Sequence, residues 1–269
     1  MSAQKQLSHI ESAKLDAEVL LSHCLKCDRS HLYAYPEEEL LASCLTQFNS
    51  LISNRAKGHP IAHLTGYREF WSIKLKVTPD TLIPRPETEC LVEHALTKIE
   101  PDAQINVLEL GTGTGAIAIA IASERSNINI TATDISEAAL DVAKENANTQ
   151  QTTINFIQAD WLTFKANTKF SIVLSNPPYI SNSDPFLKKG DVRFESESAL
   201  IANDDGLADL RTIIEQAKIV LEENGWLILE HGYQQGQAVR DLFIKNMYKE
   251  IETYADYAGH ERVTLGQLK

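Results

Sequence analysis

The sequence of 269 residues has no apolar run that approaches the roughly 18 residues of a membrane span. Its first thirty residues also lack the basic start, apolar stretch and small-residue cleavage site of a secretory signal peptide. Only four cysteines are present, and the close pair Cys24 and Cys27 has no second pair or His-x3-His segment to complete a zinc site. These absences predict a cytoplasmic protein with reduced cysteines, no membrane association and no metal.

Positive charge is also scarce. Lys and Arg number 25 against 37 Asp and Glu, which gives a net charge of −12. Residues 1–80 carry nine basic and nine acidic side chains, so residues 81–269 hold the whole excess. This balance opposes broad, sequence-independent binding to nucleic acid, which needs surplus basic side chains. Hydrophobic residues make up 43% of the chain, enough to bury a core in one or two domains of about 150 residues.

The N-terminal region, residues 1–65, is predicted to be a small helical domain. Apolar residues recur at three- and four-residue steps over 12–25 and again after Pro36, whose missing N–H suits the first turn of a helix. The segment 58–60 (GHP) ends this second helix. Nothing in the domain resembles a catalytic motif, so we expect it to recognise a substrate protein.

Residues 66–84 are predicted to form a linker with a β-hairpin strand. Apolar and polar residues alternate over 71–77, which is the period of a half-buried strand. Pro84 and Pro86 flank Arg85 and exclude regular helix there. The second domain is therefore assigned to residues 85–269.

This second domain alternates strands and helices. Helices are expected over 87–99, 115–123, 136–147, 207–221 and 235–244, and strands over 105–110, 128–133, 154–158, 170–174, 226–229, 248–254 and 262–268. Apolar strands that alternate with helices are typical of a parallel sheet covered on both faces, whereas the last two strands need an antiparallel partner. The pattern predicts an α/β, Rossmann-like domain with a seven-stranded, mostly parallel sheet.

The segment 109–115 (ELGTGTG) directly follows the first of these strands and opens a helix. Glycines let the backbone turn sharply and bring its N–H groups close to a ligand. Asp134 ends the next strand, 23 residues after Gly111, where a carboxylate can accept hydrogen bonds from both hydroxyls of a ribose. The two features predict a site for an adenosine-containing cofactor, either a nicotinamide dinucleotide or S-adenosylmethionine.

The segment 175–179 (SNPPY) lies at the end of the fourth strand. Pro177 and Pro178 remove two N–H donors, so their neighbourhood presents mostly carbonyl acceptors. The Asn176 side-chain oxygen and the adjacent main-chain carbonyl can then accept both hydrogens of a planar –NH2 group, beside the aromatic wall of Tyr179. Because an amide is a poor nucleophile, its orientation matters greatly. This motif favours S-adenosylmethionine over a nicotinamide cofactor.

Together these motifs resemble one family over essentially the whole chain. N-P-P-Y on this scaffold is typical of methyltransferases that modify planar nitrogens of adenine, cytosine or glutamine. The chain resembles the release-factor glutamine methyltransferases in the segments 82–89 (LIPRPETE), 110–115 (LGTGTG), 160–161 (DW), 175–180 (SNPPYI), 190–195 (GDVRFE) and 261–264 (ERVT). The resemblance implies a class I methyltransferase fold. It also implies methyl transfer from S-adenosylmethionine to the N5 amide nitrogen of glutamine in the Gly-Gly-Gln loop of peptide chain release factors, with S-adenosylhomocysteine as product.

The resemblance further assigns roles to individual residues. The cofactor would contact Gly111, Thr112, Gly113, Thr114 and Gly115 with its methionine part, Asp134 with its ribose, Trp161 with its adenine, and Asn176. The substrate glutamine would be held, and catalysis performed, by Asn176, Pro177, Pro178 and Tyr179. Asp160 would lie near the adenine, and Arg85 and Glu87 resemble a lid over the cofactor.

Three further features adjoin this site. Glu109 is expected either to approach the positive end of the cofactor or to lie as a charge beside the following helix. His231 follows a strand near the same crevice, where a supporting role is expected. Residues 181–206 show no clear periodicity and are expected to be a structureless loop that shapes the groove for the protein substrate.

Other functions remain open from the residues alone. Glutamine methylation of a ribosomal protein is the nearest alternative, and amino-methylation of adenine in DNA or RNA is disfavoured by the acidic second domain. A dehydrogenase would leave the segment 176–179 unexplained, and a non-enzymatic interaction protein would need only the N-terminal domain. We expect a monomer whose partners are release factors as substrates, with no direct nucleic acid.

Overall fold

The computed structural model describes residues 3–269 and contains two compact units. One unit comprises the chain up to Tyr67 together with Lys188–Phe194, and the other comprises Arg68–Leu187 with Glu195–Lys269. Among the described residues, no helix is long and apolar enough to cross a membrane.

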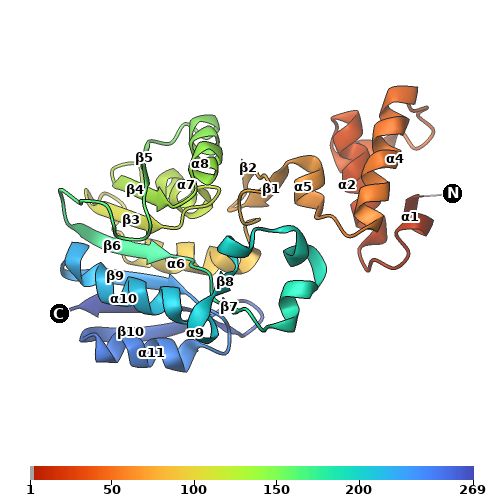
Figure 1. The fold of residues 1–269 in the computed structure, drawn as a ribbon. Helices are drawn as coiled ribbons and strands as arrows, with labels where there is room; N and C mark the ends of the chain where they lie inside the picture. Colours follow the sequence, from red (N-terminus) through yellow and green to blue (C-terminus); the bar gives the residue numbers. More distant parts are fainter. Residues whose placement is uncertain (1–2) are drawn as a thin grey trace. The chain divides into compact units, whose positions relative to one another are not determined.

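The first unit is helical (Figure 1). Its elements are α1 (Ala3–Gln6), α2 (Ala13–Leu25), α3 (Arg29–Ala34), α4 (Ala42–Ala56) and α5 (Ile61–Thr65). Its small core is formed by Leu7, Ala17, Leu20 and Ile52. The prediction that a helix begins at Pro36 is wrong, since α4 begins only at Ala42. Five of the six residues over 36–41 are exposed, so a helical turn there would gain no packing to offset the cost of nucleation.

The segment Lys188–Phe194 packs within this helical unit although it is distant in sequence. Arg55, which is largely buried, donates to Asp16 Oδ2 at 2.6 Å, to the carbonyl of His59 at 3.0 Å and to Asp191 Oδ1 at 3.3 Å. The rings of His59 and Phe194 lie 4.3 Å apart between centroids. One arginine therefore joins helices α2 and α4 to the distant segment.

The second unit begins at Arg68, within the first strand of a hairpin formed by β1 (Tyr67–Phe70) and β2 (Ile73–Lys76). Trp71 and Ser72 connect them with φ values of 52° and 56°, as a tight turn of the primed type requires. The strand predicted over 71–77 therefore begins too early, because Trp71 and Ser72 form the turn. A turn with positive φ cannot be recognised in the sequence when it contains neither Gly nor Asn. The hairpin is anchored by Asn146, which accepts from the Lys76 amide at 2.7 Å and donates to the Lys76 carbonyl at 3.0 Å.

The seven-stranded, mostly parallel sheet is confirmed. Its strands, in spatial order, are β10 (Tyr248–Ala255), β11 (Glu261–Leu268), β9 (Leu221–Glu230), β6 (Phe170–Ser175), β3 (Asn106–Leu110), β4 (Asn129–Asp134) and β5 (Ile154–Gln158). The five strands from β9 to β5 are parallel, and β11 pairs antiparallel with both β9 and β10. The chain winds from β3 through β4 to β5 and then returns to the other side of β3, which places a switch in strand order between β3 and β6.

Helices cover both faces of this sheet (Figure 1). α6 (Glu89–Thr97) and α7 (Ala116–Glu124) pack against alternate strand residues such as Val107, Ile172 and Ile228, as does Ala147 of α8 (Glu137–Thr149). α10 (Ala208–Val220) and α11 (Gly236–Lys245) pack against the intervening residues, among them Leu108, Val173 and Leu227. The strands are apolar on both faces because both faces are covered.

Residues 181–206 are not structureless, contrary to the prediction. β7 (Ile180–Ser181) pairs in parallel with β8 (Ile201–Ala202), which joins the two ends of the segment. Between and after them lie three single-turn helices, η2 (Pro185–Lys188), η3 (Gly190–Phe194) and η4 (Glu197–Ala199), and the short α9 (Asn203–Gly206). Elements of two to five residues are too short to produce a hydrophobic period, so the sequence pattern could not reveal them.

Candidate active site

The candidate site lies at the carboxyl edge of the parallel strands. Ser175 pairs in register with both Leu110 and Leu229, and Leu110 also pairs with Thr133. The residues that follow β3, β4, β6 and β9 therefore emerge side by side at the switch in strand order, where open α/β sheets bind ligands. The Ser175 hydroxyl donates to the Leu110 carbonyl at 2.7 Å and ties the two central strand ends together.

The loop that follows β3 is shaped by its glycines. Gly111, Gly113 and Gly115 have φ values of 70°, 54° and 81°, a region that other residues rarely adopt. A Cβ at Gly111 would lie 3.4 Å from the indole of Trp161, whereas one at Gly113 would meet nothing within 4 Å. The loop therefore leaves open space at Gly113 and close contact with an aromatic ring at Gly111.

Glu109 lies behind this loop and is 1% exposed. Its Oε2 accepts from the Thr112 hydroxyl at 2.7 Å and from the Ala118 amide, in the first turn of α7, at 3.1 Å. Burial raises the pKa of Glu109 to about 8, and these two hydrogen bonds oppose the rise. Its Oε1 has no hydrogen-bond partner among residues 3–269. The Glu109 side chain therefore supports the helix start and leaves its second oxygen without a partner.

Asp134 links the tip of β4 to the glycine loop. Its Oδ2 accepts from the Gly113 amide at 2.8 Å, and its Oδ1 accepts from the Ser136 amide at 2.9 Å. Ser136 in turn caps α8, as the sequence predicts, by accepting from the Ala139 amide at 3.2 Å. An ionised carboxylate has about four acceptor positions, so Asp134 retains capacity for further donors.

Trp161 is brought to the same edge by a strained backbone. Its φ of 45° is unusual for a bulky residue and turns the chain directly after Asp160. The indole lies over Gly111, and its Nε1 donates to Asp209 Oδ1 of α10 at 3.1 Å. This hydrogen bond fixes the plane of the ring beside the glycine loop. Asp160 itself is exposed.

The segment 176–179 follows β6 and is held from two directions. Asn176 donates from Nδ2 to the Thr88 hydroxyl at 3.1 Å, and the Tyr179 hydroxyl donates to Glu230 Oε1 at 3.1 Å. The Tyr179 carbonyl accepts from Gln235 Nε2 at 3.1 Å. Burial raises the pKa of Tyr179, so its hydroxyl remains a donor. Both polar side chains of the motif are therefore fixed by partners that are distant in sequence.

The ends of the 181–206 segment reach this motif as well. Gly206 has a φ of 85°, and a Cβ there would overlap the Tyr179 carbonyl oxygen and lie 2.9 Å from its carbon. Glu195 is buried and accepts from the Ile83 amide at 3.0 Å and from the Arg85 guanidinium. The proline-flanked arginine is thus held by a carboxylate from the middle of the same segment. Glu87 is exposed.

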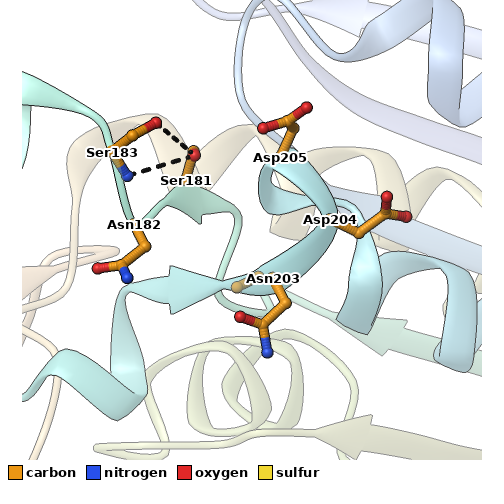
Figure 2. A pocket seen from close by; sticks show the side chains of 7 residues that line it. Ser181, Asn182, Ser183, Asn203, Asp204 and Asp205 are labelled. Carbon is orange, nitrogen blue, oxygen red and sulfur yellow. Dashed lines mark hydrogen bonds between the residues drawn. The ribbon is translucent and has the colours of Figure 1, made fainter.

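A cavity of about 330 Å³ opens beside this segment, directly after the 176–179 motif. Figure 2 shows that β7 and its following turn form one wall, with Ser183 hydrogen-bonded to Ser181, while Asn203, Asp204 and Asp205 come from α9. Six of its seven lining residues have polar side chains, and the seventh is Ala202. The segment predicted to shape a substrate groove therefore surrounds a polar hollow in the structure.

Comparison with known proteins decides the family. The PrmC N-terminal domain family matches residues 1–66, and the methyltransferase small domain family matches residues 86–191. The release factor glutamine methyltransferase of Escherichia coli (strain K12) is 48% identical over 266 residues, covering 98% of this chain and 96% of that protein. The chain belongs to the release factor glutamine methyltransferase family. The protein of that name from Vibrio cholerae is also 48% identical, with 99% and 93% coverage.

A solved methyltransferase from Pyrococcus furiosus shares the fold of this family member. Its TM-score is 0.54 at 18% identity, and the match covers 72% of this chain and 88% of that one. The likeness supports the class I methyltransferase fold that the family resemblance of the sequence implies, and at this identity it carries the fold alone.

The glycine loop and the 176–179 motif that the sequence predicts as site residues lie at the same edge of the sheet, but the sequence pattern missed the residues that hold them. Thr88 and Glu230 lie beneath the 176–179 motif, and Asp209 and Gln235 hold Trp161 and Tyr179. Of these supports, Glu230 could have been recognised in the sequence, because it is an acidic residue that ends an apolar strand.

His231 is fully buried, with Nε2 2.8 Å from the Thr264 hydroxyl, and burial lowers its pKa.

Proposed function

We propose that this protein transfers the methyl group of S-adenosylmethionine to the side-chain amide nitrogen of the glutamine in the Gly-Gly-Gln loop of peptide chain release factors. The observation that carries the proposal is the position of the 176–179 motif. It lies beside the glycine loop at the switch in strand order, in a chain of the release factor glutamine methyltransferase family. The release factor is therefore the partner, and the product is S-adenosylhomocysteine.

The residues at the glycine loop fit the cofactor. Residues 111–115 would hold its methionine part, where Gly113 leaves open space and Glu109 has one oxygen without a partner near the loop. Asp134 would accept the ribose hydroxyls with its remaining capacity, and the indole of Trp161 would border the adenine. When bound, the cofactor supplies a methyl group that is attached to a sulfonium. The sulfur of the sulfonium is a good leaving group.

The chain itself supplies orientation. The Asn176 side-chain oxygen and the neighbouring main-chain carbonyl would accept both hydrogens of the substrate amide, with the half-buried ring of Tyr179 beside the amide plane. Held in this way, the nitrogen lone pair points at the methyl carbon. The substrate nitrogen would take the methyl group that the cofactor supplies, the sulfur would leave as a neutral thioether, and the nitrogen would pass one proton to solvent. Alignment and exclusion of water supply most of the acceleration.

Methyl transfer with three acceptors tests this proposal. The protein is incubated with methyl-labelled S-adenosylmethionine and, separately, with a release factor, a ribosomal protein mixture and duplex DNA. Label in the release factor alone is expected. Label in DNA or in a ribosomal protein, with none in the release factor, would contradict the assignment.

A further inference from the structure

Gln235, directly before α11, connects the 176–179 motif to two other parts of the chain. Its Oε1 accepts from the Gly232 amide at 2.8 Å, and its Nε2 donates to the Tyr179 carbonyl at 3.1 Å and to the Asp205 carbonyl at 3.3 Å. Tyr179 is the last residue of the motif, and Asp205 lines the polar hollow that follows it. A single side chain therefore joins the motif to a wall of the hollow.

The orientation of the Gln235 amide is fixed by Gly232. A backbone N–H only donates, so the atom that faces Gly232 must be the side-chain oxygen, and the –NH2 group then faces the other way. That group has two hydrogens, and the carbonyls of Tyr179 and Asp205 give each hydrogen one acceptor. The three contacts need one acceptor and two donors at once. An amide supplies both, whereas a carboxylate would offer no donor to either carbonyl.

The turn before α11 holds Gln235 in place. The Gln235 main-chain amide donates to the Gly232 carbonyl at 2.8 Å, so both the main chain and the side chain of Gln235 bond to Gly232. Such a reciprocal pair closes the start of a helix in the manner of a capping box. A Cβ at Gly232 would lie 3.0 Å from Gln235 Oε1 and 3.5 Å from Cδ2 of the Tyr179 ring. Glycine at this position therefore leaves room for both side chains.

The peptide group between Tyr179 and Ile180 is bonded through both of its polar atoms. Its carbonyl accepts from Gln235, and its amide donates to the Leu200 carbonyl at 3.0 Å. The ring of Tyr179 is held separately, because its hydroxyl donates to Glu230 Oε1 at 3.1 Å. Without the Gln235 donor, the carbonyl half of this peptide would lose that bond. The ring would then lose one of the two points that fix its position.

We propose that Gln235 is a positioning residue of the acceptor site. Its –NH2 group fixes the carbonyls of Tyr179 and Asp205, which sets the Tyr179 ring beside the substrate amide and holds the wall of the hollow next to the motif. Gln235 acts through Tyr179 and makes no contact with the reacting atoms in this account. The inference rests on the proposed function and deepens it, and all the residues involved lie in one compact unit.

Two variants separate this role from closure of the turn. Gln235→Glu keeps an oxygen for the Gly232 amide, and a glutamate suits a helix start, but the change removes both donors and sets a negative charge against two carbonyl oxygens. Gln235→Met removes the acceptor as well as the donors. Gln234→Glu is the matched control, because it adds the same charge at the neighbouring exposed position.

Full-length proteins are assayed for kcat and KM with release factor, for S-adenosylmethionine affinity by calorimetry and for folding by circular dichroism. Positioning predicts a kcat lower by about 100-fold in both Gln235 variants, because the substrate amide is misaligned with the methyl group. Cofactor affinity should be unchanged, since the hydrogen bonds of Gln235 among residues 3–269 reach neither Asp134 nor Trp161.

A role in closing the turn alone predicts a different result. Gln235→Glu would then have the same kcat as Gln234→Glu, and only Gln235→Met would be impaired. That result would overturn the inference. So would a loss of cofactor affinity in Gln235→Glu as large as its loss of kcat, because the damage would then extend beyond the acceptor site.

Hydrogen exchange of the Ile180 amide, followed by NMR, does not depend on methyl transfer. This amide reports how firmly the peptide after Tyr179 is held. Its exchange should be about tenfold faster in Gln235→Glu than in Gln234→Glu, because the Tyr179 carbonyl loses its donor and faces a negative charge. Equal exchange rates would overturn the inference. If the starting protein fails to methylate release factor, the proposed function is wrong, and the exchange rates still decide whether Gln235 holds Tyr179.

Discussion

Gly206→Ala tests the close approach between the 181–206 segment and the 176–179 motif. The glycine has a φ of 85°, and a Cβ there would overlap the Tyr179 carbonyl oxygen and lie 2.6 Å from Gln235 Nε2. The left-handed conformation costs an alanine roughly 1–2 kcal/mol. Relief of the overlap costs about 1–3 kcal/mol more, because backbone rather than a flexible side chain must move.

The variant should therefore be less stable by roughly 2–5 kcal/mol, which corresponds to a melting temperature lower by about 4–20 °C for a unit of this size. It should also lose methyl transfer at temperatures where it remains folded, since Tyr179 must move away from its position. Gly259→Ala is the matched control, because Gly259 has a φ of 84° and a Cβ there meets nothing within 4 Å. The free energy of unfolding of the control should fall only by the roughly 1–2 kcal/mol that the left-handed conformation costs an alanine.

Differential scanning calorimetry and a methyl-transfer assay on both variants measure these effects. Equal destabilisation of the two variants would refute the overlap with Tyr179. A Gly206→Ala protein that is destabilised but fully active would show that the position of the motif does not depend on this contact.

Four further outcomes are expected. Asn176→Ala should lower kcat by at least about 100-fold while S-adenosylmethionine still binds in calorimetry, because only the acceptor of the substrate amide is removed. Asp134→Asn should weaken cofactor binding by roughly 10- to 100-fold, since hydrogen bonds to a charged group contribute about 1.5–3 kcal/mol; unchanged affinity would contradict the ribose assignment. Glu109→Gln should remove a pH dependence of the free energy of unfolding. The pKa of Glu109 in the folded state is about 8, above its ordinary value of 4.5, so the folded state holds a proton that the unfolded state releases. Stability of the starting protein relative to this variant should therefore decline as the pH rises from about 4.5 to 8 in denaturant titrations. Arg55→Ala, which removes the bonds to Asp16 and Asp191, should speed proteolysis within 188–194, and an unchanged cleavage rate would show that the arginine does not hold the segment.

Regular structure was predictable wherever the chain follows a long period. The continuous apolar strands and intervening helices of residues 105–268 yield the parallel sheet directly, and the switch in strand order then places the glycine loop beside Asn176. The helix that was predicted to begin at Pro36 illustrates the limit of local sequence signals. Proline at a helix start is favourable, yet the exposed residues after it have nothing to pack against.

The supports of the site could not be read from the sequence because they are long-range and polar. Trp161 meets Asp209, and Asn176 meets Thr88, across the folded sheet rather than along the chain. No period or spacing encodes such pairs. Glu230 is the partial exception, since a carboxylate ending an apolar strand at the ligand-binding edge is the same signal that identified Asp134.

The glutamine of a release factor is the proposed methyl acceptor. Mass spectrometry of a release factor treated with this protein and S-adenosylmethionine locates the methyl group. We expect a mass increase of one methyl group on the peptide containing Gly-Gly-Gln, located on the glutamine side chain and absent when the Asn176→Ala variant replaces the starting protein. A methyl group on any other residue, or an unmodified Gly-Gly-Gln peptide beside a methylated ribosomal protein or nucleic acid, would contradict it.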